Sequence, residues 1–472
     1  MRRAKIVCTI GPSSEQRETI RQMILSGMDV ARLNFSHGNH DWFRKIVKII
    51  REESEKLGKA VSIIQDLQGI KIRIGEVQNG EVILTEGQTI EIFPGNQLSN
   101  EKKLYISYPS LIEDVKAEEE ILIDDGLLRI KIIEKLSDRL IGVVVEGGVL
   151  KSKKGVNLPF TRTTVSSFTE KDQADLLLGI EIDVDYIAIS FVRNRHDIEK
   201  IKKWAKEKNI LLPSIISKIE KREALKNIEE ILELSDGIMV ARGDLGVELS
   251  PEEVPVYQKM LIELANQKKK IVITATQMLE SMKEHSRPTR AEASDVANAV
   301  LDGTDALMLS AETTVGKYPV EAVRTMDSII RFTEERLGEK ILPSFKVSNY
   351  FPEAIASGAV RVAQDINAKA IVVFSHSGFA ALLISKLRPK MPIVAFTPDY
   401  KVYRKLSLLW AVIPMHIPQN IDFIDNAFLR ETEKQLKSLN LAMDGDAVVF
   451  VASSPFMGNK NVIRLHRIGD SL

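Results

Sequence analysis

The chain has 472 residues, of which 44% are hydrophobic, so it is long enough for more than one domain with a large core. Lysine and arginine together number 65, as do aspartate and glutamate, and the zero net charge argues against a general nucleic-acid or membrane-surface binder. The single cysteine, Cys8, excludes an internal disulfide and fits a reducing compartment.

The sequence shows no targeting or membrane-spanning segment. Its first residues, MRRAKIVCTIGPSS, lack the long apolar core of a signal peptide. No segment is apolar over the roughly 18 or more consecutive residues that a spanning helix needs. We therefore expect a cytoplasmic protein that binds neither a membrane nor nucleic acid.

Eight short apolar runs follow one another along the chain, each ending in polar residues or glycine. Continuous hydrophobicity marks strands buried on both faces, as in a parallel sheet, and the stretches between them have helical spacing. Eight such units in series predict an α/β fold, a (β/α)8 TIM barrel, whose active site lies at the carboxyl ends of the strands. The runs are residues 5–10, 30–35, 62–68, 186–192, 214–220, 237–243, 271–277 and 306–312.

The interval between the third and fourth runs is much longer than the others. It contains alternating, β-branched stretches and turn signals such as Asn79-Gly80 and Gly147-Gly148. We predict a small β-barrel domain over residues 71–156, inserted into a barrel domain of residues 1–70 and 157–345. A domain on this loop overhangs the active-site end of the barrel and is placed to act as a lid.

After about residue 345 the strand–helix pattern restarts. We predict a separate C-terminal α/β domain over residues 346–472, with a helix at 352–365 and strands at 370–374, 392–396, 411–414 and 447–451. Its loop Ser375-His376-Ser377-Gly378 follows a strand and opens a helix, where exposed amides and hydroxyls can hold a phosphate. An ordinary capped turn explains the same residues.

Residues 214–248 carry the strongest chemical signal. Side chains alternate along a strand, so Lys218 and Glu220 point the same way, and Asp244 follows the next strand. If those strands are parallel neighbours, two carboxylates and an ammonium share one site. Hard oxygen ligands with open positions predict Mg2+ or Mn2+, and the lysine suits an anionic substrate. On these residues alone, a surface salt bridge is the alternative.

Several stretches, in order, resemble the pyruvate kinase family. They cover the barrel almost end to end, whereas the resemblance is weaker inside the inserted domain and weakest in the last one. The resemblance implies Mg2+-dependent phosphoryl transfer from phosphoenolpyruvate to ADP, giving pyruvate and ATP in glycolysis, usually by a homotetramer. The stretches are KIVCTIGPSS, ARLNFSHG, the end of DLQGIKIRIG, KGVNLP, SKIE, MVARGDLGVE, TATQMLESM and PTRAEASDVANAVLDGTDALMLSAET.

The family motifs imply roles for the matched residues on the substrate side. Lys218 would stabilise the transferring phosphoryl group and the enolate oxygen, and Arg32 would hold the phosphate. Glu220 and Asp244 would bind Mg2+. The turn Ala241-Arg242-Gly243-Asp244 would bind the substrate carboxylate through the free amides of a short helix.

The remaining matches concern proton transfer and the nucleotide. Thr276 and Ser310 would lie where the enolate is protonated, with a relay through water to Glu312, although simple helix capping also explains both hydroxyls. The family's nucleotide-contacting positions match Asn34, His37, Arg73 and Lys154, which in isolation are more often surface residues.

One departure from the common family pattern concerns the monovalent cation. Most relatives need K+, held by an asparagine, a serine, an aspartate and a threonine with the help of a glutamate. Here Asn34, Ser36 and Asp66 are retained, but Leu67 replaces the threonine and Lys71 replaces the glutamate. An ammonium repels K+, so we expect Lys71 to supply the charge and K+ not to be required. Alternatively, Lys71 points to solvent and K+ still binds.

In the family, the last domain carries the allosteric site. We therefore expect a phosphorylated small-molecule effector at Ser375, Ser377 and Gly378. The late loop, residues 453–458, lacks the tryptophan and arginine of relatives that respond to fructose 1,6-bisphosphate, which argues for a different effector.

Two other functions stay open at this point. A metal-dependent aldolase or lyase also pairs a glutamate with an aspartate, but the lid and the Lys154 and His37 matches favour a nucleotide. A catalytically inactive, ligand-sensing protein is the other alternative, and the complete set of Arg32, Lys218 and the metal ligands argues against it.

Overall fold

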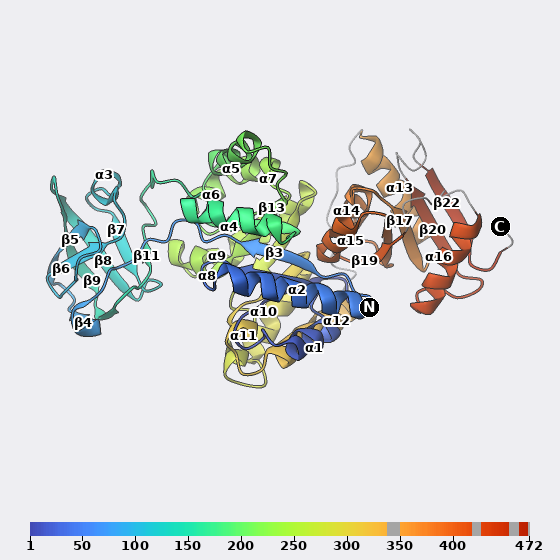
Figure 1. Cartoon of the computed structure of the whole chain (residues 1–472), viewed down its shortest axis with the longest axis horizontal. Helices are drawn as coiled ribbons and strands as arrows, with labels where there is room; N and C mark the ends of the chain where they lie inside the picture. Colours follow the sequence, from blue (N-terminus) through green and yellow to red (C-terminus); the bar gives the residue numbers. More distant parts are fainter. Residues whose placement is uncertain (338–349, 418–425, 453–461, 471–472) are drawn as a thin grey trace.

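The computed structural model describes residues 1–337, 350–417, 426–452 and 462–470, and it has three parts in a row. In Figure 1 the inserted β region lies at one end, the barrel in the middle and the C-terminal α/β region at the other end. The late loop 453–458, considered above as an effector contact, lies outside the described residues.

Eight parallel strands close into the central barrel, with each strand hydrogen-bonded to its sequence neighbours around the ring and β16 to β1. The predicted TIM barrel is confirmed. The strands end one to three residues before the apolar runs do. The strands are β1 (Lys5–Thr9), β2 (Val30–Asn34), β3 (Ser62–Asp66), β12 (Tyr186–Ile189), β13 (Ser214–Ile219), β14 (Gly237–Ala241), β15 (Ile271–Ala275) and β16 (Ala306–Leu309).

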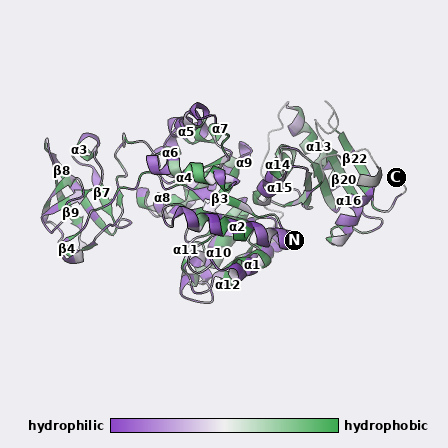
Figure 2. Cartoon of the chain, viewed as in Figure 1, coloured by the Kyte–Doolittle hydropathy of each residue, from purple (hydrophilic) through white to green (hydrophobic). Residues whose placement is uncertain are grey.

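Helices surround the barrel and turn their apolar faces inward. In Figure 2 the strands are mostly hydrophobic and the helices show hydrophilic outer faces. Capping defines several helix starts; for example, the Thr169 and Thr289 hydroxyls each accept the amide three residues later. The helices are α1 (Arg17–Ser26), α2 (His40–Lys56), α4 (Glu170–Glu181), α5 (Arg195–Glu207), α6 (Arg222–Lys226), α7 (Ile228–Leu234), α8 (Arg242–Glu248), α9 (Glu253–Gln267), η2 (Glu280–Lys283), α10 (Arg290–Leu301), α11 (Ala311–Thr314) and α12 (Pro319–Leu337).

The inserted region is all β apart from two short helical turns, and it has a hydrophobic core of its own. A six-stranded sheet has the order β11-β7-β8-β9-β5-β6, and a second sheet pairs β10 with β4. Its elements are η1 (Gln78–Gly80), β4 (Glu81–Leu84), β5 (Thr89–Pro94), β6 (Lys103–Ile106), α3 (Leu111–Asp114), β7 (Glu120–Ile123), β8 (Leu128–Lys135), β9 (Leu140–Glu146), β10 (Gly148–Lys151) and β11 (Val156–Asn157).

The C-terminal region is a five-stranded sheet of order β19-β18-β17-β20-β22 with helices packed on it. Its last strand, β22, is antiparallel and was not predicted, because its polar residues, among them Arg464 and His466, hide the strand pattern. The elements are α13 (Phe351–Asp365), β17 (Ala370–Phe374), α14 (Phe379–Lys386), β18 (Ile393–Thr397), α15 (Tyr400–Lys405), η4 (Leu406–Leu408), β19 (Val412–His416), α16 (Asn426–Ser438), β20 (Ala447–Ala452) and β22 (Val462–Arg467).

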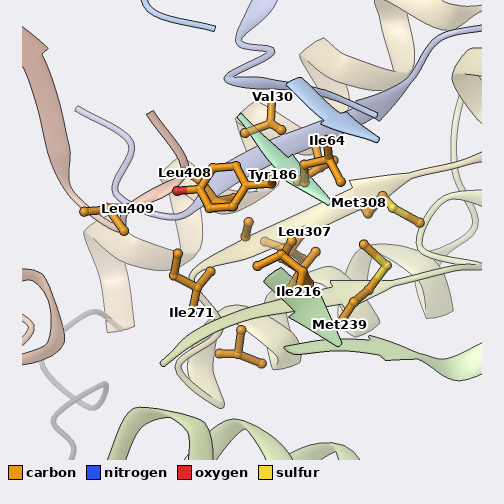
Figure 3. Close-up of a cluster of buried hydrophobic side chains, with 14 of the residues drawn as sticks. Val30, Ile64, Tyr186, Ile216, Met239, Ile271, Leu307, Met308, Leu408 and Leu409 are labelled. Atoms are coloured by element: carbon orange, nitrogen blue, oxygen red, sulfur yellow. The ribbon is translucent and has the colours of Figure 1, made fainter. Parts of the chain in front are cut away.

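The amino-terminal end of the barrel packs against the C-terminal region through apolar and charged contacts. Figure 3 shows the buried side chains of Tyr186 and Ile271 from barrel strands near Leu408 and Leu409. Beside them, the Asp305 carboxylate contacts both the Lys386 ammonium and the Arg388 guanidinium, the latter at 2.8 Å, and all three side chains are buried. Among the described helices, none is both long and apolar enough to cross a membrane.

Candidate active site

A buried network of charges lies at the carboxyl ends of β2, β3 and β13. Lys218 Nζ lies 2.8 Å from Glu220 Oε1 and 3.3 Å from Asp66 Oδ1. The other oxygen of Asp66 accepts a hydrogen bond of 2.7 Å from Arg32 Nε. The sequence placed Lys218 and Glu220 on one face of a strand, and their contact agrees with that expectation. Two cations and two carboxylates therefore share a space from which most water is excluded.

The network controls the protonation states of its members. Burial disfavours the Lys218 ammonium, but the Asp66 and Glu220 carboxylates outweigh it and raise the pKa of Lys218. Burial likewise opposes ionisation of Asp66, but Lys218 and Arg32 hold the pKa of that carboxyl below its usual range. Lys218 is thus a fixed positive charge at neutral pH.

Glu220 directly follows β13, Asp244 lies in α8 after the neighbouring strand β14, and the two carboxyl groups are close enough to interact. Burial raises the pKa of Glu220 in spite of Lys218, and the nearby Asp244 carboxylate adds to the rise. A second oxygen of Glu220 accepts the Phe191 amide at 2.7 Å, which orients the carboxyl group. Two carboxylates that repel each other at a barrel mouth gain from a cation placed between them.

This donor set fits Mg2+ or Mn2+. Both side chains offer hard oxygen ligands, and Mg2+ in phosphoryl-transfer sites is commonly held by one or two carboxylates plus substrate oxygens. Within the described part of the chain, no group of three or more His, Cys, Asp or Glu residues is arranged to hold a metal. A cation at Glu220 and Asp244 would therefore keep positions open for substrate.

The start of α8 lies between β14 and β15 and is fixed by Thr276. The helix begins at Arg242, within the turn from which the family resemblance implied a short helix, and the Gly243 amide donates to Thr276 Oγ1 at 2.7 Å. That amide is therefore already partnered. Thr276 and Gln277 both have a positive φ, 69° and 55°, which marks a backbone held in an unfavourable conformation at the strand end.

The Arg242 side chain binds groups of the barrel wall in this structure. Its guanidinium lies 2.7 Å from Asp295 on α10 and donates to the Thr276 carbonyl at 2.8 Å. The expected substrate contact of Arg242 is thus limited to its backbone at the start of the helix, while the side chain locks α8 against the turn that carries Thr276.

Ser310 and Glu312 follow β16 and are linked through the backbone. The Ser310 hydroxyl is buried and has no hydrogen-bond partner in the described structure, so it is free to bond to a ligand. Glu312 instead accepts the Ser310 amide at 2.7 Å and the Leu279 amide at 3.0 Å. Burial raises the pKa of Glu312. Glu312 orients the turn that carries Ser310.

The inserted β region faces this site across a cavity of about 310 Å3 that Lys71, Arg73, Asp124 and Asp244 help to line. Lys154 belongs to the inserted region, and its ammonium lies 2.9 Å from Asp124. His37 is largely exposed on the barrel side, and partial desolvation, followed by the charges of Lys71 and Arg73, lowers its pKa. Of the residues expected to contact a nucleotide, Arg73 lines this cavity, and Lys154 contacts the lining residue Asp124.

The residues considered for a monovalent cation are engaged with protein groups. Both Asp66 oxygens contact Arg32 or Lys218, and Asn34 Oδ1 accepts the Ser36 amide at 3.1 Å. The Leu67 side chain is buried and offers no oxygen. Lys71 is half-buried, and its pKa is lowered by burial and by Arg73, while Asp244 acts in the opposite direction. Lys71 therefore faces the site.

The loop considered for an effector phosphate caps helix α14. Ser375 is buried, and its Oγ accepts the Gly378 amide at 2.9 Å. Gly378 has a φ of 80°, a conformation that glycine adopts without strain. Ser377 and Gly378 also line a separate cavity next to the barrel, described below.

Ser190 is a site residue that sequence reasoning missed. Its hydroxyl accepts a hydrogen bond of 2.8 Å from Lys218 and donates to the Leu67 carbonyl at 2.7 Å. Ser190 directly follows β12, so its position at the end of a barrel strand was the available signal. Thr9, whose hydroxyl accepts a 2.9 Å hydrogen bond from Arg32, was missed in the same way.

Comparisons with known proteins agree with this arrangement. A family model described as "Pyruvate kinase, barrel domain" matches residues 1–323, and one described as "Pyruvate kinase, alpha/beta domain" matches residues 353–466. The chain belongs to the pyruvate kinase family. The match spans all parts of the fold described above.

Individual relatives show the same agreement over the whole chain. This chain is 43% identical to a pyruvate kinase of Geobacillus stearothermophilus, over 100% of this chain and 81% of that protein. It is 42% identical to one of Corynebacterium glutamicum, over 99% and 98% of the two chains. A crystal structure of a pyruvate kinase from Cryptosporidium parvum superposes with a TM-score of 0.90 at 36% identity, covering 99% of this chain and 96% of the other.

Proposed function

We propose that the protein transfers a phosphoryl group from phosphoenolpyruvate to ADP, giving pyruvate and ATP, with Mg2+ or Mn2+ at Glu220 and Asp244. The observation that carries the proposal is the position of Lys218. Its ammonium is held charged between Asp66 and Glu220 beside the proposed metal ligands, in a family of pyruvate kinases. A fixed charge of this kind stabilises oxygens that gain charge during transfer without having to reorganise.

Each group of the site then has a task. Arg32, aligned by Asp66 and Thr9, would hold the phosphate of phosphoenolpyruvate with its planar donors. Lys218 would lie against the enolate oxygen that forms as the phosphoryl group leaves. A divalent cation, when bound, neutralises phosphoryl and carboxylate oxygens and fixes their orientation.

The proton that completes pyruvate must reach the methylene carbon of the enolate. Ser310 offers a buried hydroxyl that no described group occupies, and Thr276 has a hydroxyl on the neighbouring strand end. Glu312 is tied to two backbone amides, so it would position Ser310 and help carry the proton only through water. The nucleotide would enter from the lid side, between Lys154, Arg73, His37 and Asn34.

A coupled assay tests the proposal directly. Purified protein, phosphoenolpyruvate, ADP and MgCl2 should give pyruvate and ATP in equal amounts, and chelation of the metal should stop both. Formation of pyruvate without ATP would favour the lyase alternative. Absence of any turnover, with substrate binding intact, would favour a ligand-sensing protein.

We further propose that the enzyme does not require K+. The lack of a side-chain oxygen at Leu67 and the engagement of Asp66 and Asn34 support this, as does the half-buried Lys71 beside the site. Its ammonium would take the place of the cation, and a bound K+ would be repelled by it. The rate with Mg2+ and a bulky organic cation should equal the rate with K+ at the same ionic strength; a many-fold rise with K+ would contradict the proposal.

Family membership also supports four further expectations. We infer a cytoplasmic homotetramer in which residues 71–156 act as a lid and the Ser375–Gly378 loop responds to a phosphorylated effector. Sedimentation at micromolar concentration, with and without substrate, measures the assembly. A monomer of full activity would remove the tetramer from the proposal.

A further inference from the structure

A second cavity, of about 480 Å3, lies at the opposite end of the barrel from the site described above. Its barrel side is formed where four consecutive strands begin. Tyr186, Ser214 and Ile271 are the first residues of β12, β13 and β15, and Asp236 directly precedes β14. Its other side is formed by α14, α15 and η4 of the C-terminal region. The cavity therefore lies at the interface between the barrel and the C-terminal region.

The lining of this cavity is positively charged. Four lysines and two carboxylates line it; the lysines are Lys268, Lys269, Lys270 and Lys405, and the acids are Asp236 and Glu353. Lys268 also lies 3.7 Å from Glu229, so about one positive unit remains in excess. A phosphate monoester carries about −1.5 to −2 charges at neutral pH and would be attracted by that excess.

Two of the lysines are held in place by neutral groups. Lys270 Nζ donates to the Ser235 carbonyl at 2.7 Å, and Lys405 Nζ donates to the Ser214 hydroxyl at 3.0 Å. Neither bond neutralises the ammonium. Burial lowers the pKa of both lysines, while Asp236 and other nearby carboxylates act in the opposite direction. An anion that entered the cavity would find preoriented donors.

The opposite wall is apolar. Phe379, Leu382 and Leu383 of α14 face the cavity together with Val402 and Leu406, and Phe379 remains 42% exposed. Figure 3 shows Tyr186 and Ile271 of the barrel beside Leu408 and Leu409, so this wall continues the buried cluster that joins the two regions. A ligand with an apolar or planar body could cover it.

We propose that this cavity binds a small phosphate monoester, with the phosphate at Lys270 and Lys405 and the apolar or planar body against α14 and α15. This deepens the regulation proposed above, because Ser377 and Gly378 of the expected effector loop form part of the wall, whereas the buried Ser375 does not. The site is on the barrel side of that loop.

The position of the cavity explains how a ligand there would reach the active site. The four strands that begin at the cavity end at Ser190, at Lys218 and Glu220, at the start of α8 and at Thr276. At about 3.3 Å per residue, four to six residues separate the two sites by roughly 13–20 Å of rigid strand. Tyr186 Oη donates to the Lys405 carbonyl at 3.0 Å, so the same contacts also connect the regions. A bound ligand would fix α15 against these strands.

Ligand-observed NMR titration of the full-length protein tests the proposal with phenyl phosphate as the probe. Phenol and inorganic phosphate are its two halves. Phenyl phosphate should bind with a Kd of about 1 mM or lower, and each half about tenfold more weakly, because both walls contribute. Lys270→Gln should raise the Kd about tenfold or more, since a charged hydrogen-bond donor is lost. Lys405→Gln should do the same.

Two further variants separate this site from other anion sites. Lys200→Gln, an exposed lysine of α5 outside the cavity, should bind the probe like wild type. Lys218→Met should also bind it, because the active site is at the other barrel end. Three results would overturn the proposal. They are equal affinity of wild type and Lys270→Gln for the probe, loss of probe binding in Lys218→Met, and no binding by wild type at a probe concentration of about 10 mM. Binding is measured without catalysis, so a failed coupled assay alongside Lys270-dependent binding would refute the activity and leave this site standing.

Discussion

Removal of the Lys218 ammonium is the sharpest perturbation of the site, and it has two separable costs. The catalytic cost comes from the transition state, where loss of a preorganised donor typically costs about 2.7–4 kcal/mol, or roughly 10²–10³ in kcat. Because Lys218 carries a full charge, we expect Lys218→Met to lose at least that much in kcat, with a smaller change in KM.

The second cost is to stability and follows from the contacts. Breaking a buried ion pair costs about 3–5 kcal/mol when one partner is left uncompensated. In Lys218→Met, however, Asp66 keeps Arg32 and Glu220 keeps the Phe191 amide. The free energy of unfolding should therefore fall by an amount near the lower end of that range, about 3 kcal/mol. Urea unfolding measures this cost, and turnover per folded molecule measures the catalytic one.

Lys386→Met is the matched control. Lys386 is also buried and paired with an aspartate, but it lies at the opposite end of the barrel. It should lose a comparable amount of stability while the folded fraction keeps its kcat within a few fold. If Lys218→Met retained a kcat within about tenfold of wild type, the role assigned to Lys218 would be wrong.

Three other changes test contacts at the active site and at the opposite end of the barrel. Lys71→Glu combined with Leu67→Thr restores a carboxylate and an oxygen beside Asp66 and should make the rate rise several-fold with K+, which a K+ titration at constant ionic strength would show; a flat response would mean that Lys71 does not replace the cation. Ser190→Ala removes the acceptor of a Lys218 hydrogen bond and should lower kcat about tenfold with little change in KM, since such a bond contributes about 1.5 kcal/mol; a rise in KM alone would assign Ser190 to substrate binding. Asp305→Asn leaves Lys386 and Arg388 buried without a carboxylate and should cost about 3–5 kcal/mol in urea unfolding; a loss below about 1 kcal/mol would show that the cluster is not a main contact between the two regions.

The sequence was most informative about features that depend on a single strand, such as which side chains share a face. The side-chain alternation that put Lys218 and Glu220 on one face holds for any strand, whatever it packs against. The barrel followed from the number of apolar runs, because eight consecutive strand–helix units with strands buried on both faces are typical of a closed parallel barrel. The strand β22 was not predicted, because an edge strand with a half-buried Arg464 and an exposed Arg467 need not be apolar.

The side-chain contacts between different strands could not be predicted from the sequence pattern. Asp66 illustrates the difficulty. Its place at the end of β3 was predicted, but its partners depend on the twist of the barrel and on side-chain length. The family resemblance implied that Asp66 binds a monovalent cation, whereas the structure pairs it with Arg32 and Lys218. Arg242 shows the same limit, since only the fold reveals that its side chain turns to Asp295.

The pairing of Asp66 bears on the cation question itself. A carboxylate that already contacts two cations gains little from a third, because each added positive charge is repelled by the others at short range. With Lys71 also facing the site, we propose that this end of the barrel holds enough positive charge to receive an anionic substrate without K+. In a relative with glutamate at the position of Lys71, the balance would shift by two negative units, and a bound monovalent cation would restore it. The exchange of one side chain thus accounts for the difference in cation requirement that we propose.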